Sequence, residues 1–160
     1  HWRLTLRSVE HLFISPGHNF YGRQGQTPGS HPLLRVQKID CGAGRGIKGD
    51  RFFDYKPDYK GQITFFAAEV FDLICTELNL EGADPAALRR NVITRGPDLN
   101  QLIGTEFTLQ GLQFLGIEEC RPCSWMNIAL RHPGAEQWLR GRGGLRAKIL
   151  TDGPLQRDRS

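Results

Sequence analysis

Hydrophobic and polar residues alternate over several short stretches of this 160-residue chain. Alternation with a period of two places apolar side chains on one face of a strand and predicts half-buried β-strands. Gly111 separates two of the stretches, which are expected to form strands joined by a turn. The predicted strands cover residues 4–14 (one strand or two short ones), 33–39, 62–65, 105–109, 111–118 and 145–150, and the last ends in the turn Thr151-Asp-Gly-Pro154.

Helical periodicity is confined to a small part of the chain. Apolar residues recur at intervals of three and four over residues 67–79, which predicts an amphipathic helix. Short helices broken by Pro133-Gly134 are expected around Trp125–Leu139. Many short strands, one substantial helix and abundant glycine turns predict a mainly β fold with minor α. We expect a β-barrel or a strongly curved sheet with a few helices outside it.

Two segments rich in glycine and proline interrupt the predicted strands. Residues 15–32 form a loop longer than most structural connections, and such loops often border a site. Residues 41–51 carry four glycines, which allow a sharp turn and a close approach to a ligand. The Gly-Lys-Ser/Thr ending of a Walker loop is missing from it, and no long helix follows. A ligand-binding loop and a plain strand-to-strand connection both remain open for this segment.

Length and composition predict one folded domain over residues 1–160, with 39% hydrophobic and 24% charged residues. Neither a membrane-length apolar run nor a secretory signal pattern is present, so we expect a cytoplasmic protein without a membrane partner. Arginine supplies 16 of the 21 basic residues behind the net charge of +4. These residues are scattered along the chain, which argues against a dedicated nucleic-acid partner.

Cys123 is the strongest candidate for chemistry among the four cysteines. It follows an apolar strand and precedes a predicted helix, and both the helix N-terminus and Arg121 favour a thiolate, whereas Glu118 and Glu119 oppose it. A thiolate is a nucleophile and a ligand for soft metals. The spacing Cys120-Arg-Pro-Cys123 also fits a redox pair, two ligands of one metal, or one functional cysteine beside an incidental one.

Four segments follow one another in a characteristic order along the chain. They are Gly46-Ile-Lys-Gly-Asp-Arg51, Arg89-Arg-Asn-Val-Ile-Thr94, Cys120-Arg-Pro-Cys123 and Gly141-Arg-Gly-Gly-Leu-Arg-Ala147. Together they give the chain a resemblance to the MOSC family, which is named for the C-terminal part of molybdenum cofactor sulfurases. The resemblance extends over about residues 35–153 and implies a closed β-barrel like that of pyruvate kinase, with peripheral helices.

The resemblance implies a site for the molybdenum cofactor, molybdopterin. Cys123 matches the family's single invariant cysteine, which in oxidoreductase members ligates molybdenum. Arg89 and Asn91 correspond to an arginine and an asparagine that grip the cofactor, and Arg51 and Arg142 are carried over by motif alone. We therefore expect Cys123 as the metal ligand and the other four as cofactor-binding residues.

Three functions are compatible with this site. The first is two-electron reduction of N-hydroxylated substrates, with electrons from a partner reductase. The second is sulfur carriage, in which Cys123 holds a persulfide received from a cysteine desulfurase and Cys120 is available to resolve it. The third is a non-catalytic module that stores or delivers the cofactor. We expect the reductase function and keep the other two as alternatives.

Overall fold

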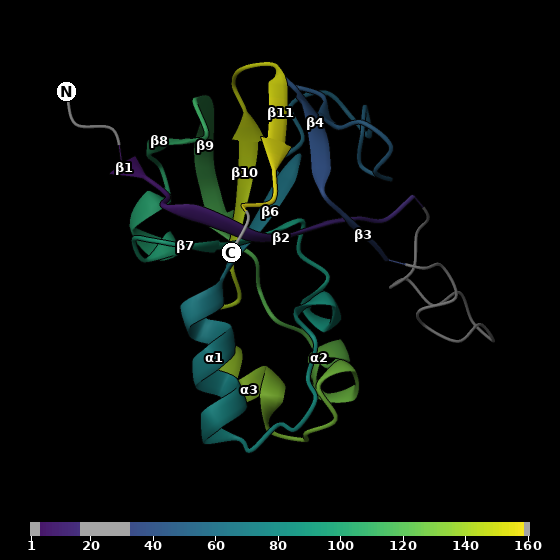
Figure 1. Ribbon diagram of the computed structural model, residues 1–160, viewed down its shortest axis with the longest axis vertical. Helices are drawn as coiled ribbons and strands as arrows, with labels where there is room; N and C mark the ends of the chain where they lie inside the picture. Colours follow the sequence, from purple (N-terminus) through teal and green to yellow (C-terminus); the bar gives the residue numbers. More distant parts are fainter. Residues whose placement is uncertain (1–3, 17–32, 159–160) are drawn as a thin grey trace.

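Eight strands hydrogen-bond into one mixed sheet, and three more form a smaller sheet beside it (Figure 1). The structure is a computed structural model that describes residues 4–16 and 33–158. Most of the loop predicted at 15–32 therefore lies outside the described residues. In spatial order the large sheet contains β1 (Leu4–Thr5), β8 (Glu106–Leu109), β9 (Leu112–Glu119), β10 (Leu145–Ile149), β6 (Ile63–Ala67), β7 (Val92–Arg95), β2 (Ser8–Ile14) and β3 (Leu34–Val36). The small sheet contains β11 (Gly153–Gln156), β4 (Lys38–Gly42) and β5 (Gly46–Ile47).

The mainly β prediction is confirmed, whereas the closed barrel is not. Within residues 4–16 and 33–158, the strands at the two ends of the large sheet, β1 and β3, do not pair with each other. The stretch predicted as one strand over 33–39 is divided at Gln37. Its first part pairs with β2 and its second part, β4, pairs with β11 of the small sheet. The chain thus leaves the large sheet before the sheet closes.

Where helices cover the large sheet, neighbouring residues of one strand belong to different cores. In β6, Phe65 packs in the core shared by the two sheets, and Phe66 packs under the helices. Phe65 forms a cluster with Phe107 and Phe114, with all three ring-centroid distances at 5.4 Å. These three rings are fully buried and join β6, β8 and β9. Such aromatic pairs contribute about 0.5–1.5 kcal/mol beyond the area they bury.

The helices gather on one side of the strands, in the lower half of Figure 1. The predicted helix over 67–79 is observed as α1 (Ala68–Glu77), and the break at Pro133-Gly134 separates two short helices as expected. In the described part of the chain, no helix is long and apolar enough to cross a membrane. The remaining helical elements are the 3-10 turns η1 (Pro85–Leu88) and η2 (Leu99–Leu102) and the α-helices α2 (Trp125–Ala129) and α3 (Ala135–Leu139).

Replacement of Gly116 by alanine is expected to destabilise the fold. A Cβ atom there would lie 2.0 Å from the carbonyl oxygen of Leu102, because η2 crosses β9 at this glycine. We expect Gly116→Ala to lower the free energy of unfolding by about 1–3 kcal/mol or more, measured by urea denaturation. Gly42→Ala is the matched control, since its Cβ would meet nothing closer than 3.4 Å. Equal stability of the two variants would contradict the packing described here.

Candidate functional site

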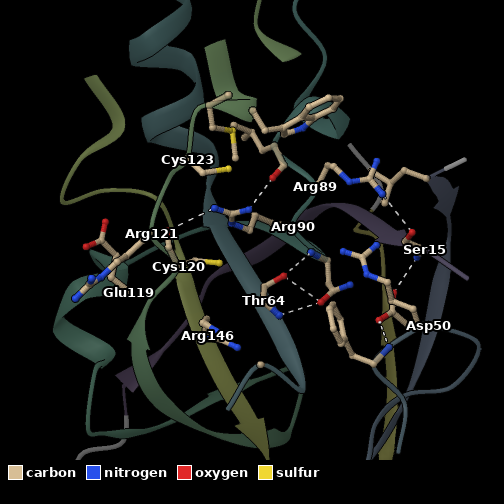
Figure 2. Close-up of a pocket in the computed structure, with 18 of the residues that line it drawn as sticks. Ser15, Asp50, Thr64, Arg89, Arg90, Glu119, Cys120, Arg121, Cys123 and Arg146 are labelled. Atoms are coloured by element: carbon tan, nitrogen blue, oxygen red, sulfur yellow. Dashed lines mark hydrogen bonds between the residues drawn. The ribbon is translucent and has the colours of Figure 1, made fainter. Parts of the chain in front are cut away.

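A cavity of about 340 Å³ opens between the large sheet, the loop that follows β5 and the segment that carries Cys120 and Cys123 (Figure 2). This volume lies at the lower end of the range for small-molecule sites. Its floor is a polar row that crosses β9, β10 and β6 and reaches Asn91, the residue before β7. Glu118 pairs with Arg146, Arg146 with Thr64, and Thr64 lies next to Asn91. The strands that build the aromatic core on one face therefore present polar groups to the cavity on the other.

Cys123 and Cys120 both line this cavity and both are free thiols. Cys123 is exposed and lies between the end of β9 and the start of α2, as the sequence predicted. Its carbonyl accepts a hydrogen bond from the backbone N–H of Met126 at 2.9 Å, which fixes the entry into α2. The cavity therefore offers an accessible sulfur on a segment that is tied to a helix.

The buried guanidinium of Arg90 holds the cysteine segment in place. Its Nη1 donates to the carbonyl of Leu88 at 2.8 Å and its Nε to that of Gly143 at 3.0 Å. Its Nη2 donates to the carbonyl of Cys120 at 3.4 Å. Arg90 thus joins three segments that are distant in sequence. We assign Arg90 a positioning role. Sequence analysis missed this role because the residue type alone does not show whether an arginine is buried or exposed.

The glycines near residue 143 allow two backbones to pass unusually close together. A Cβ atom on Gly143 would lie 2.1 Å from the carbonyl oxygen of Cys120. Gly144 has a φ of +108° and would place a Cβ atom 2.4 Å from the carbonyl oxygen of Phe65. Its own carbonyl accepts a hydrogen bond from Cys120 N–H at 2.8 Å. These glycines therefore serve the packing of the cysteine segment against β10.

Arg142 does not line the cavity, although the sequence placed it among the cofactor-binding residues. Its guanidinium carbon lies 3.6 Å from the centroid of the Trp138 ring. Its Nε also donates to the Trp138 carbonyl at 3.0 Å. The predicted role of Arg142 stays a prediction, and it would require the side chain to leave this indole.

Arg51 and Arg89 meet on another wall of the cavity, where Asp50 lies beside them. Arg89 ends η1 in the left-handed region, with a φ of +58°, and its Nη2 donates to Ser15 Oγ at 3.3 Å. Its Nε is buried without a hydrogen-bond partner among the described residues. Burial, followed by the positive charge of Arg51 and opposed by Asp50, lowers the pKa of Arg89 to about 10.

Asp50 accepts hydrogen bonds from the backbone, and its single negative charge offsets only one of the two neighbouring positive charges. Its Oδ1 accepts the N–H of Ser15 at 2.8 Å and its Oδ2 that of Phe52 at 3.2 Å. One carboxylate thus faces two guanidinium groups, Arg51 and Arg89. The wall carries an excess of positive charge in a partly desolvated place, which suits an anion.

Asn91 lines the cavity, but most of its amide is used within the protein. Its Oδ1 accepts hydrogen bonds from Thr64 N at 2.9 Å and Thr64 Oγ1 at 3.1 Å. Its Nδ2 donates to the carbonyl of Phe13 at 3.2 Å. These bonds join β2, β6 and β7 under the cavity. One amide hydrogen is left over for a ligand.

Arg146, Tyr59 and Glu118 form a further wall that the sequence analysis did not assign. Arg146 Nη2 donates to Tyr59 Oη at 3.1 Å, and its Nη1 lies 3.5 Å from Glu118 Oε1. The signal in the sequence was a charged residue between the buried Leu145 and Ala147 of one strand. Alternation predicts that such a residue faces away from the core, and here that side is the cavity floor.

The described residues hold no group of three or more His, Cys, Asp or Glu side chains able to bind a metal ion.

The cysteines are expected to differ strongly in reactivity. Burial, and secondarily Asp40, raise the pKa of Cys41 to about 12. At pH 8 the Cys41 thiolate fraction is then roughly one in ten thousand. We expect iodoacetamide to modify exposed Cys123 in the native protein and Cys41 only after denaturation, as measured by peptide mass spectrometry. Modification of native Cys41 at the rate of Cys123 would contradict this assignment.

Comparison with known proteins gives a family and a fold. The family described as MOSC domain matches residues 49–158. Among solved structures, the YuaD protein of Bacillus subtilis superposes with a TM-score of 0.70 at 20% identity, covering 93% of this chain and 90% of that one. YiiM of Escherichia coli gives 0.63 at 13% identity, covering 94% of this chain and 66% of that one.

YiiM of Geobacillus stearothermophilus is similar, with a TM-score of 0.62 at 13% identity over 92% of this chain and 71% of that one. A search of curated proteins found no match. The structural similarities, at these identities, show a shared fold. The family match covers most of the chain and confirms the resemblance carried by the four sequence segments. This chain belongs to the MOSC family.

Proposed function

We propose that the domain binds a molybdenum–pterin cofactor in the cavity, with the Cys123 thiolate as its ligand to the metal. The family is associated with binding of this cofactor. The observation that carries the proposal is the meeting of Cys123 with Arg51 and Arg89 around one cavity, although they come from three separate segments. A soft thiolate suits the metal, and guanidinium groups suit a phosphate.

The positive charge of Arg51 and Arg89 supports this wall of the cavity as the binding site for the cofactor's phosphate. The positive charge of Arg51 is one cause of the lowered pKa of Arg89, and an anion between the two side chains would relieve this repulsion. The unpartnered Nε of Arg89 and the hydroxyl of Ser15 would add hydrogen bonds to the same anion. In this proposal Arg51 and Arg89 neutralise the phosphate, and Asn91 contributes its remaining amide hydrogen to the pterin.

The proposed reaction is reduction of an N-hydroxylated substrate. The bound metal centre would supply two electrons that a partner reductase replaces, and cleavage of the N–O bond with two protons would release water. Tyr59 Oη and Glu118 Oε1 lie on the cavity wall, linked by Arg146, and are the groups that would pass these protons. Cys123 would hold the metal on the accessible side, where a substrate enters.

Sulfur carriage is the second candidate, and a specific observation favours it. Cys120 lines the same cavity as Cys123, and neither forms a disulfide. A persulfide on Cys123, received from a cysteine desulfurase, would give its outer sulfur to an acceptor thiolate and leave the Cys123 thiolate behind. Attack by Cys120 on the inner sulfur would instead release hydrosulfide and form a disulfide. A module that only stores the cofactor would bind it without either reaction.

Molybdenum content distinguishes these functions. Protein produced with added molybdate is expected to carry up to about one metal atom per chain, and Cys123→Ser to lose it, because the hydroxyl is a much poorer ligand for a soft metal. Elemental mass spectrometry of the purified proteins measures this. Cys75→Ser is the control, since Cys75 lies on α1 outside the cavity and should keep the metal.

Equal metal content in wild type and Cys123→Ser would refute the ligand assignment. Metal-free wild type with a mass increase of one sulfur atom on Cys123 would instead support sulfur carriage. Intact-mass spectra recorded before and after reduction would show that increase.

Arg89→Gln separates ligand binding from stability. The variant removes a partly buried charge whose pKa burial lowers, so the free energy of unfolding of the metal-free protein should equal or exceed that of wild type. Loss of a charge-assisted hydrogen bond should weaken cofactor retention by about tenfold or more. Urea denaturation and metal content after dialysis measure the two quantities. A destabilised variant with unchanged metal retention would contradict the assigned role.

A further inference from the structure

Trp125 has a buried indole N–H group that nothing in the described structure accepts. Its Nε1 is buried without a hydrogen-bond partner, and the residue lines the cavity. Trp138 provides the contrast, because its Nε1 donates to Glu77 Oε1 at 2.9 Å, outside the cavity. These two tryptophans thus differ in whether a protein group accepts a hydrogen bond from the indole N–H, which is the only side-chain donor of tryptophan.

A buried donor without an acceptor destabilises a folded protein, because it has lost water and gained nothing in exchange. Packing of the indole ring at the start of α2 does not require this N–H group. The N–H group of Trp125 is therefore useful only if something in the cavity accepts its hydrogen. Indole nitrogen donates and never accepts, so that group must be an acceptor atom.

The charges around the cavity indicate what kind of acceptor fits. Arg89 contributes a second buried, unpartnered N–H to the same lining. The carboxylate of Asp50 is already bonded through both oxygens, and Glu119 Oε2 accepts the N–H of Gly143 at 3.1 Å. Donors and positive charge are thus in excess over free acceptors. An oxygen of an anion is the acceptor that satisfies both kinds of group.

We propose that Trp125 is a ligand-positioning residue whose indole N–H donates to an oxygen of an anionic ligand in the cavity. It lies two residues after Cys123, so it would orient that oxygen beside the sulfur. The proposal rests on the proposed function only for the identity of the ligand. Its chemical class, an oxyanion or a phosphate, follows from the donors and charges of the lining.

Indole N–H signals of the full chain, labelled with ¹⁵N and observed by NMR, test this directly. Trp125→Phe and Trp138→Phe assign the two signals, and titration with sodium molybdate or inorganic phosphate supplies the anion. We expect the Trp125 signal to shift saturably with at least one of the anions while the Trp138 signal stays in place. Trp125→Phe should weaken binding of that anion by about tenfold or more, since a hydrogen bond to a charged group is lost.

Stability of the anion-free variants gives a second, independent readout. Both replacements shrink a partly buried ring, but only Trp138→Phe also loses a hydrogen bond, the one to Glu77. We therefore expect Trp125→Phe to be the less destabilised of the two variants in urea denaturation. A shift with molybdate alone would place the donor at the metal end of the ligand, and a shift with phosphate alone would place it at the phosphate.

Two results would overturn the inference. One is an indole signal of Trp125 that moves with neither anion, or anion binding that Trp125→Phe leaves unchanged. The other is a loss of stability in anion-free Trp125→Phe that equals or exceeds the loss in Trp138→Phe, which would mean that water or the protein already satisfies the donor. Either result would leave the proposed function standing if wild-type protein retains molybdenum and Cys123→Ser does not.

Discussion

The site depends on one buried guanidinium. Arg90 binds the carbonyl groups of Leu88, Gly143 and Cys120 and thereby holds the cysteine segment against the end of η1 and the start of β10. Its neighbour Arg89 has a left-handed backbone conformation and lines the cavity, and its Nε is buried without a hydrogen-bond partner among the described residues. The two adjacent arginines therefore differ, since the side chain of Arg90 donates to three carbonyl groups of the protein and that of Arg89 donates to Ser15 alone in the described structure.

Local features of the fold could be predicted, and features set by long-range pairing could not. Helix α1 and the turn at Gly111 follow from periodicity and from a glycine with a φ of +80°, both of which act within a few residues. The sequence predicts a turn at residues 151–154 and one strand over 33–39, whereas β11 begins at Gly153 and the second part of 33–39 forms β4. Neither strand was foreseen, because β4 and β11 are defined by their pairing with each other across the chain. Closure of a barrel also depends on pairing between strands that are distant in sequence, and the closed barrel is not confirmed.

The candidate site was predictable as a set of motifs but not as a geometry. Motifs identified Cys123, Arg51 and Arg89, and the structure brings all three to one cavity. They also selected Arg142, whose side chain lies on an indole outside it. The direction of a side chain depends on strand register and on neighbours from distant segments. This is also why Arg146, on the cavity floor, went unassigned.

The central claim is that Cys123 binds molybdenum inside the cavity. An anomalous difference map, calculated from crystals of metal-loaded protein measured on either side of the molybdenum absorption edge, tests it most directly. The account predicts one strong peak at bonding distance from Cys123 Sγ, on the side that faces Arg89. A peak elsewhere, or one without a sulfur neighbour, would contradict it.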